Sequence, residues 1–585
     1  MRALAGSALL FGLLAGAWDA ISIVLENPHS FGAVRSIASF AGASLAGYGG
    51  LGLAAGAVLG LVLRSTSRRA APGAVSVALA LWLFFWAGVR VHVRWFFGEP
   101  LLAAPSLVAN ALLFGGCAAA AALARPLTRR VAAAGESAPG IGAGLALIAI
   151  GAIAAGFGPT RPFPPPARET PPAGARDVLL VTLDTTRADH LSSYGYPRGT
   201  TPSIDRLART GACDVLWASA PLTNPSHCAI LSGVSPRSTG VLNNGTALPP
   251  GVPTVAELLS QQGWTCAAFV SGIPLKAGLS GLSRGFRVYD DAFSPLERVH
   301  PMLTSLAIVR VADRLLPGDL LERRAADTVD AAIGWLARPA RPRFVWVHLF
   351  DPHTPYRAAR PLVHRFARES APWTASGRAM TSWPIADYDA EIRGTDLALG
   401  RLLRAFEETS PDGAVVIVAD HGEGLLQHGE LTHGSLLFEE DLRIPWIVRG
   451  AGPTSPGAEA RLEGLAPPRA STEASAVLRA LARGEALPPA GTGRLVADTF
   501  PPEGRGRRTA VCGLLPDGRI GKTMIDWERG ERVAFDLAAD PGETRPADAS
   551  GSAWAVLEPP APDAASAEEL DPEVARRLKS LGYVH

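Results

Sequence analysis

Aspartates close three apolar segments in the central part of this sequence, and a histidine directly follows the last of them. They are Asp184, Asp351 and the pair Asp420-His421, each preceded by six or seven mostly apolar residues. Such runs predict buried strands, and their alternation with helical patterns favours a mostly parallel sheet. Ligands of these sheets bind beyond the carboxyl ends of the strands, so we expect the three carboxylates on one rim. A single strand-terminal aspartate is usually a helix cap or loop residue, but three of them with a histidine favour a metal site.

A polar turn that contains proline opens a short apolar helical segment at residues 221–233. Thr223 is expected at the N-cap of this helix, where unpaired backbone N–H groups favour an anion. An ordinary capping threonine is the alternative interpretation. Beside a metal ion, however, a hydroxyl can lose its proton and attack phosphorus or sulfur, which makes Thr223 a candidate nucleophile.

Several histidines lie in or beside loops of the same kind, namely His348, His353, His421 and His428. Clustered histidine and aspartate suit Zn²⁺ or Mn²⁺. The spacing matches neither a helix-borne His-Glu-x-x-His zinc site nor a cysteine-based one. His364 lies in a polar, helix-like stretch and is expected to be exposed.

Helical patterns separate the predicted strands and complete an α/β domain over residues 177–450. They cover residues 204–210, 254–262, 325–336 and 387–407. Residues 451–585 carry Gly/Pro-rich linkers and several predicted elements: helices at 472–483 and 571–581, and short strands near 494–500, 509–514 and 519–526. We therefore expect a small C-terminal α+β subdomain with an antiparallel sheet, and its sequence shows no catalytic pattern.

The first 157 residues differ from the rest because they hold five apolar stretches, at 4–25, 40–63, 73–93, 100–124 and 138–157. Each has about the 20 residues that a helix needs to cross a bilayer. For the first stretch a signal peptide is the alternative, since Arg2 precedes it. Basic residues are concentrated in alternate loops, which predicts a cytoplasmic N-terminus and a five-span domain at residues 1–157 in the inner or cell membrane. A Pro-rich, semi-rigid linker at 158–176 would then lead to a periplasmic or extracellular domain.

Composition excludes several classes of protein. A net charge of +1 gives no support to nucleic-acid binding, and 48% hydrophobic against 19% charged residues is too apolar for disorder. Five cysteines in 585 residues exclude a disulfide framework, although Cys213, Cys266 and Cys512 could pair in an oxidising compartment. No feature of the sequence indicates an oligomeric state.

Five blocks, in order along the chain, resemble bacterial sulfatase-like proteins of the alkaline phosphatase superfamily. They are residues 183–191, 223–233, 351–356, 420–423 and 433–445. Residues 535–544 and 578–583 also look like the C-terminal part of that family. With the membrane domain that the apolar stretches predict, the expected fold is an α-helical membrane domain followed by an α/β domain in which helices sandwich a mostly parallel sheet, as the resemblance implies. It also implies metal-dependent ester chemistry.

Taken residue by residue, the resemblance implies that Asp184, Asp420 and His421 hold the metal. Thr223 would be the nucleophile and a fourth metal ligand. His433 stands where sulfatases place a lysine that contacts the substrate anion.

Three further residues are expected at the substrate. His353 stands where sulfatases place a substrate-contacting histidine, and either His353 or His433 could protonate the leaving group. Asn244 falls where threonine-dependent nucleotide phosphodiesterases of the superfamily place an asparagine on the phosphoryl oxygen. His227 takes the place of the arginine in the sulfatase motif Cys/Ser-x-Pro-Ser-Arg.

The departures from the sulfatase pattern favour phosphoryl chemistry. Sulfatases mature the cysteine or serine of their motif to formylglycine, which Thr223 is not expected to yield. The second acid of the family's Asp-Asp pair is Thr185, and a lysine and a histidine of a later segment are replaced by Ser271 and Ile273. What remains resembles the threonine-dependent phosphoryl branch of the superfamily.

The leading hypothesis is therefore a membrane-anchored, outward-facing hydrolase of phosphate or sulfate esters that uses one or two Zn²⁺, Mn²⁺ or Ca²⁺ ions. Its partners would be the lipid bilayer and a small ester, lipid or glycan substrate. The alternative is a phosphoethanolamine- or phosphoglycerol-type transferase that modifies an envelope lipid or glycan. A catalytically degenerate membrane protein is the third hypothesis, although Asp184, Thr223, Asp420 and His421 are all present.

Overall fold

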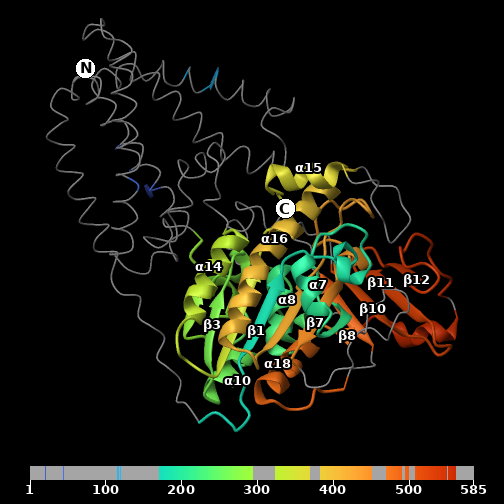
Figure 1. Cartoon of the computed structure of the whole chain (residues 1–585). Coiled ribbons are helices and arrows are strands. Elements are labelled where there is room, and N and C mark those ends of the chain that lie inside the picture. Colours follow the sequence, from blue (N-terminus) through green and yellow to red (C-terminus); the bar gives the residue numbers. More distant parts are fainter. Residues whose placement is uncertain are drawn as a thin grey trace, which may run out of the picture. The chain divides into compact units, whose positions relative to one another are not determined.

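The computed structural model describes residues 170–293, 323–368, 382–450, 469–489, 494–499, 507–549 and 551–560, with a few isolated positions before residue 170 (Figure 1). Nearly all of them belong to one compact unit of residues 162–291, 323–578 and 583–585. Within these described ranges, no helix combines the length and the apolar character needed to cross a membrane. The five predicted spans, most of the Pro-rich linker and the predicted helix at 571–581 lie outside the described residues.

An eight-stranded sheet forms the centre of this unit. In spatial order its strands are β4 (Val288–Asp290), β3 (Thr265–Phe269), β5 (Arg343–Leu349), β1 (Val178–Leu183), β6 (Ala414–Ala419), β7 (Arg443–Arg449), β2 (Ala212–Trp217) and β8 (Arg469–Ala470). All neighbouring pairs are parallel except the two that β7 makes with β6 and β2. The predicted mostly parallel sheet is thus confirmed.

The central strands are buried along their whole length, which explains their continuous apolar sequences. Every residue of β1, β5 and β6 is buried. Strands that are covered on both faces cannot alternate apolar with polar side chains, so their sequences read as uninterrupted apolar runs. Because β5, β1 and β6 are parallel neighbours, their carboxyl ends lie at one edge of the sheet.

Two groups of helices cover the sheet. Helices α7 (Pro202–Ala208), α14 (Ala325–Leu336) and α16 (Ser382–Thr409) form one group, and α8 (Thr223–Ser232), α10 (Val255–Gln261) and α18 (Glu473–Arg483) form the other. These helices confirm the predicted helical segments to within a few residues. The remaining helices are short: η3 (Ala188–His190), η4 (Ser192–Tyr194), α9 (Pro236–Thr239), η5 (Ile273–Leu275), α11 (Ala277–Ser280), α15 (Arg360–Arg368) and α17 (Glu439–Leu442).

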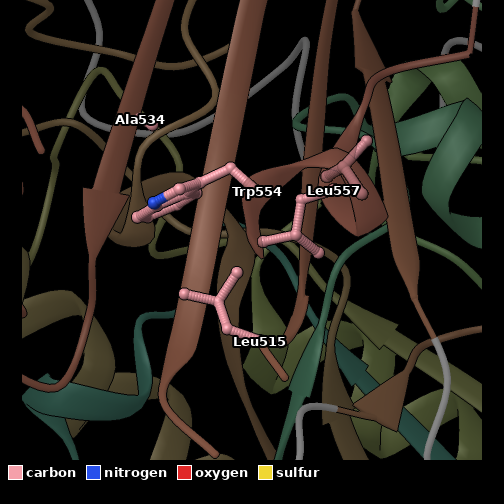
Figure 2. Close-up of a cluster of buried hydrophobic side chains, with 5 residues drawn as sticks. Leu515, Ala534, Trp554 and Leu557 are labelled. Atoms are coloured by element: carbon pink, nitrogen blue, oxygen red, sulfur yellow. The ribbon is translucent and has the colours of Figure 1, made fainter. Parts of the chain in front are cut away.

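A second, antiparallel sheet follows in the chain and is drawn in orange and red in Figure 1. Its order is β12 (Glu531–Asp536), β11 (Ile520–Asp526), β10 (Arg508–Leu514) and β9 (Leu495–Thr499). Figure 2 shows part of its own small core, where Leu515 and Ala534 pack with Trp554 and Leu557 of helix η7 (Ser552–Leu557). Three of its strands were expected from the sequence, and β12 was not.

The cysteines form no disulfide within the described part of the chain. Cys213, Cys228, Cys266 and Cys512 are all free thiols. The pairing that the sequence left open for Cys213, Cys266 and Cys512 is therefore not formed. These residues lie on separate strands, β2, β3 and β10, which keeps them apart.

Candidate active site

The register of the central strands brings Asp184 and Asp420 together. β1 pairs in parallel with β6, so that Leu183 lies opposite Ala419, and each acid is the next residue. The ladder continues past the strand ends, because Asp420 N donates to Leu183 O at 3.2 Å. The structure places three possible ligand atoms within 4.8 Å of one another, one each from Asp184, Asp420 and His421. All three residues are fully buried.

The third strand-end acid, Asp351, follows β5 on the same rim as expected, because β5 runs parallel to β1, but its environment differs from that of Asp184. Its Oδ2 atom accepts a hydrogen bond of 2.6 Å from Ala325 N, at the start of α14. Leu349 pairs with Leu183 across β5 and β1, so Asp351 comes one residue later than Asp184 in the register. Side chains alternate between the two faces of a sheet, and this offset turns Asp351 away.

Thr223 is the first residue of helix α8 and not its N-cap. The N-cap is Leu222, with extended backbone angles, and no side chain caps the helix. Thr223 Oγ1 is buried and has no hydrogen-bond partner among the described residues. The helix is tied to the end of β6, since Ser226 Oγ donates to Asp420 O at 2.6 Å. The expected capping position is thus wrong by one residue, and the hydroxyl is not used to stabilise the helix.

Five buried polar atoms at this edge of the sheet lack a hydrogen-bond partner in the described structure: Thr185 Oγ1 and, among the candidate ligands, Asp184 Oδ1, Thr223 Oγ1, Asp420 Oδ2 and His421 Nε2. An unpaired buried polar group costs about 1–3 kcal/mol, so such groups normally find partners. Two carboxylates, an imidazole and a hydroxyl form a donor set that suits a divalent cation such as Zn²⁺ or Mn²⁺. The residues present therefore fit the metal that the sequence implied.

The other atoms of the same side chains are held by the protein. Asp420 Oδ1 accepts hydrogen bonds from Thr185 N at 3.1 Å and from His421 N at 2.8 Å. His421 Nδ1 donates to Gly422 O at 2.9 Å, which leaves Nε2 with its lone pair. His348 Nε2 lies 3.1 Å from Asp184 Oδ2. Each candidate ligand is oriented by such a bond, as metal sites require.

The electrostatics of the site also favour a cation. Burial raises the pKa of the Asp184 carboxyl, an effect that His353 and His433 partly oppose. Burial and the neighbouring Asp184 raise the pKa of Asp420 well above its usual value. Burial lowers the pKa of His421 well below its usual value. Two buried carboxyls this close cannot both ionise without a compensating positive charge, which a divalent ion would supply.

His227 is buried at the same edge of the sheet, and its Nδ1 lies 3.5 Å from Asp420 Oδ2, while its substrate contact stays a prediction. Its Nδ1 donates to Thr223 O at 2.7 Å, and its Nε2 lies 2.9 Å from Thr182 Oγ1. Burial and the neighbouring His348 lower its pKa to about 3, so the ring is neutral. Trp346 Nε1 donates to the same Thr182 hydroxyl at 3.0 Å. His227 therefore links the start of α8 to strand β1.

His433 is paired with a buried carboxyl. Its Nδ1 lies 3.1 Å from Glu423 Oε1, and the ring centroids of His433 and His421 are 4.3 Å apart. Burial by itself would lower the pKa of His433, but the charge and hydrogen bond of Glu423 raise it above its usual value. His433 is therefore favoured in its protonated form, which can hold an anion or donate a proton.

His353, in contrast to His433, is favoured in its neutral form. Its ring stacks on Phe350 at 4.4 Å and meets the ring of His433 edge-on at 5.0 Å. Its Nδ1 donates to Thr354 O at 2.5 Å. Burial lowers its pKa to about 4, although the nearby Asp184 opposes the shift. The two neighbouring imidazoles thus favour different protonation states.

Asn244 contacts the start of helix α8. Its Oδ1 accepts a hydrogen bond of 2.9 Å from Asn224 N, and its side chain is buried. Because the amide oxygen is used in this bond, the NH₂ group is the end that is oriented to donate. This arrangement suits contact with an anionic oxygen next to Thr223.

Some roles at the site were not predicted from the sequence. His348, one of the clustered histidines, orients Asp184 from β5, and Glu423, which was not singled out, holds His433. Thr185, a β-branched residue, adopts a left-handed backbone with φ of 48°, and Tyr388 OH donates to its carbonyl at 2.5 Å. Backbone strain of this kind is typical of functional sites. Of the other histidines, His428 binds Glu440 and His364 is exposed as predicted.

Similarities to known proteins agree with this geometry. The Delta 4,5-hexuronate-2-O-sulfatase of Bacteroides thetaiotaomicron is 25% identical over 320 residues, 47% of this chain and 62% of that enzyme. The phosphoethanolamine transferase EptC of Escherichia coli is 24% identical over 251 residues, 42% of this chain and 40% of that protein. The alignments thus leave more than a third of each relative's length unmatched.

The crystal structure of the phosphonate monoester hydrolase of Agrobacterium radiobacter superposes with a TM-score of 0.48 at 18% identity, over 65% of this chain and 92% of that one. The model of the Sulfatase family matches residues 176–471, which is just over half of the chain. That range includes the strands that end in Asp184 and Asp420, the helix that begins with Thr223, and the loop that carries His433. The chain belongs to the sulfatase family.

Proposed function

We propose that this chain is a metal-dependent hydrolase of phosphate or sulfate esters, with Thr223 as its nucleophile and a preference for phosphoryl groups. One observation carries the proposal. Thr223 Oγ1 is fully buried, without a hydrogen-bond partner in the described part of the chain, at the start of a helix whose Ser226 bonds to the main chain of the candidate ligand Asp420. A hydroxyl that neither caps its helix nor bonds to a neighbour is suited to a chemical role.

Four side chains would hold the metal, those of Asp184, Thr223, Asp420 and His421. A bound divalent ion would favour loss of the Thr223 proton and offset negative charge on the ester oxygens. The chain's own groups would position the ester, because the N–H of Thr223 at the start of α8 and the NH₂ group of Asn244 can donate to its oxygens.

The proposed covalent step uses Thr223 and His433. Thr223, deprotonated at Oγ1 with its proton released to solvent, attacks phosphorus as the bond to the leaving oxygen breaks, and His433 donates a proton to that oxygen. Water then attacks the phosphorus of the phospho-threonine, the bond to Thr223 Oγ1 breaks to restore the deprotonated threonine, and His433 takes up the proton that the water loses. His433 suits the acid role because Glu423 favours its protonated form, whereas His353 is favoured as neutral.

The choice of phosphoryl over sulfuryl transfer rests on the nucleophile. Threonine is not expected to yield the formylglycine of sulfatases, and the motif has His227 where their arginine stands. The full-length protein should hydrolyse an aryl phosphodiester or monoester at least about tenfold better in kcat/KM than the matching aryl sulfate, a difference of roughly 1.4 kcal/mol. Thr223→Ala should abolish turnover with the fold intact. Preferential cleavage of the sulfate, or an active alanine variant, would refute the proposal.

A transferase is the second candidate. It is supported by the similarity to the phosphoethanolamine transferase EptC and by the apolar stretches of residues 1–157. In that case an acceptor alcohol, in place of water, would take the group from Thr223. Incubation with a phospholipid labelled in its head group distinguishes the two: a labelled acceptor indicates transfer, and a free labelled product indicates hydrolysis.

Membrane anchoring with an outward-facing catalytic domain is also part of the proposal. It is supported by the five apolar stretches and by the distribution of arginines between their loops. A reporter that is active only outside the cytoplasm should be active when fused after residue 176 and silent when fused near Arg68. The reverse pattern would contradict the five-span topology.

A further inference from the structure

The C-terminal sheet contacts the loop of His433 at Gly434, the residue that follows His433. Thr499, the last residue of β9, donates from Oγ1 to Gly434 O at 2.5 Å, and both residues are buried or nearly so. Gly434 has φ of 103°, and a Cβ atom there would lie 3.0 Å from Leu222 Cδ2. Leu222 is the residue before Thr223. Gly434 is thus enclosed between β9 and the start of the nucleophile helix.

Further contacts from the same sheet follow along the loop. Arg508 of β10 donates to Ser435 O. Lys522 of β11 is fully buried, and its Nζ lies 3.1 Å from Glu439 Oε1 and 2.8 Å from Glu543 Oε1. Glu543 also accepts a hydrogen bond of 2.6 Å from Glu439 N. Residues 434–439 are therefore held at three points by the C-terminal sheet and the segment that follows it.

We propose that the C-terminal sheet is a positioning element of the active site, and that Thr499 is the positioning residue that acts on His433 through Gly434. This inference rests on the proposed function, in which His433 contacts the ester. Thr499 itself touches neither substrate nor metal.

The physical reason is the irregular backbone of the loop. Residues 433–438 belong to no helix or strand, so regular backbone ladders do not hold them. The ring of His433 is fixed on one side by Glu423, and its main chain depends on the anchored carbonyl of Gly434. Displacement of a catalytic group by about 1 Å can cost orders of magnitude in rate, so loss of this anchor should lower turnover.

Variants of Thr499, with Thr523 as the control residue, test the proposal in the full-length, metal-loaded protein. Thr499→Val removes the hydroxyl but keeps the shape of the side chain, and Thr499→Ser retains the hydroxyl. Thr523→Val is the control, because Thr523 lies in the same sheet, is fully buried, and its hydroxyl has no partner among the residues that the structure describes. Turnover of an aryl phosphodiester, metal content, and hydrogen–deuterium exchange of peptides covering residues 433–439 are measured for each.

We expect Thr499→Val to lower kcat about tenfold with KM within about twofold and metal content unchanged, since a transition-state contact is misplaced. Exchange in residues 433–439 should rise, Thr499→Ser should restore both readouts, and Thr523→Val should match the wild type. A Thr499→Val variant with wild-type kcat and exchange would overturn the proposal, as would an equal loss in Thr523→Val. If the wild type cleaves no ester, the proposed function fails, and the exchange data alone decide whether the sheet positions the loop.

Discussion

The Nδ1 atom of His433 lies 3.1 Å from the Oε1 atom of Glu423, a carboxyl group that is fully buried. A histidine held in this way presents its other nitrogen in a fixed direction and is favoured in the protonated form. In the proposed reaction this pair takes the place of the sulfatase lysine. The relationship leads to the first prediction.

Glu423→Gln should move the pH dependence of kcat. The protonated form of His433 donates the proton, so kcat falls as the pH rises through the pKa of His433. The Glu423 charge raises that pKa, and its removal should shift the fall in kcat to lower pH, with about three- to tenfold less activity at pH 8. A pH–rate series on the wild type and the variant checks this, with His433→Ala as the control that should lack this limb. Superimposable profiles for wild type and Glu423→Gln would contradict the role of the pair.

Asp420→Ala should remove most of the bound metal. The full-length protein should carry about one to two equivalents of Zn²⁺ or Mn²⁺, and loss of one charged ligand weakens such a site strongly. Asp351→Asn is the matched control, because this second strand-end acid bonds to the start of α14. It should keep its metal while losing about 1 kcal/mol of stability. Elemental analysis of the purified variants distinguishes the two, and full metal retention in Asp420→Ala would refute the ligand assignment.

Gly422→Ala should prevent correct folding of the site. A Cβ atom at Gly422 would lie 1.8 Å from Glu440 O, which is far inside van der Waals contact. The backbone would have to move, at a cost of about 3 kcal/mol or more. Gly334→Ala in α14 is the control, since a Cβ atom there would meet no other atom within 4 Å, and alanine should stabilise that helix by up to about 1 kcal/mol. Thermal unfolding of both variants tests the prediction, and equal melting temperatures would show that the overlap is relieved cheaply.

His227→Ala should lower stability and kcat without raising KM. Its ring bonds to Thr223 O and Thr182 Oγ1, so its removal breaks two buried hydrogen bonds and leaves a cavity, at a cost of about 2–4 kcal/mol. The exposed His364→Ala should have no effect and serves as the control. Denaturant unfolding and steady-state kinetics measure the two effects. An increase in KM alone would instead support the substrate contact that the sequence suggested.

The sequence by itself determined the type of domain and the candidates for its chemistry. Uninterrupted apolar runs ending in Asp184 and Asp420 are typical of buried parallel strands, because burial on both faces leaves no room for alternation. Parallel strands then bring their carboxyl ends to one edge, so these two acids could be placed together. The motif at Thr223 and the pair Asp420-His421 resembled the sulfatase-like proteins, and the family match confirms that the chain belongs to the sulfatase family.

Only the tertiary structure decided which side chains face the site and what holds them. Asp351 lies apart from Asp184 because it comes one residue later in the register of β5 and β1. That register is set by the pairing of the strands, which the local sequence does not encode. His348 bonds to Asp184 across 164 residues, and Thr499 bonds to Gly434 across 65. The sequence around each residue does not indicate such contacts, because they form only when segments that are distant along the chain pack together.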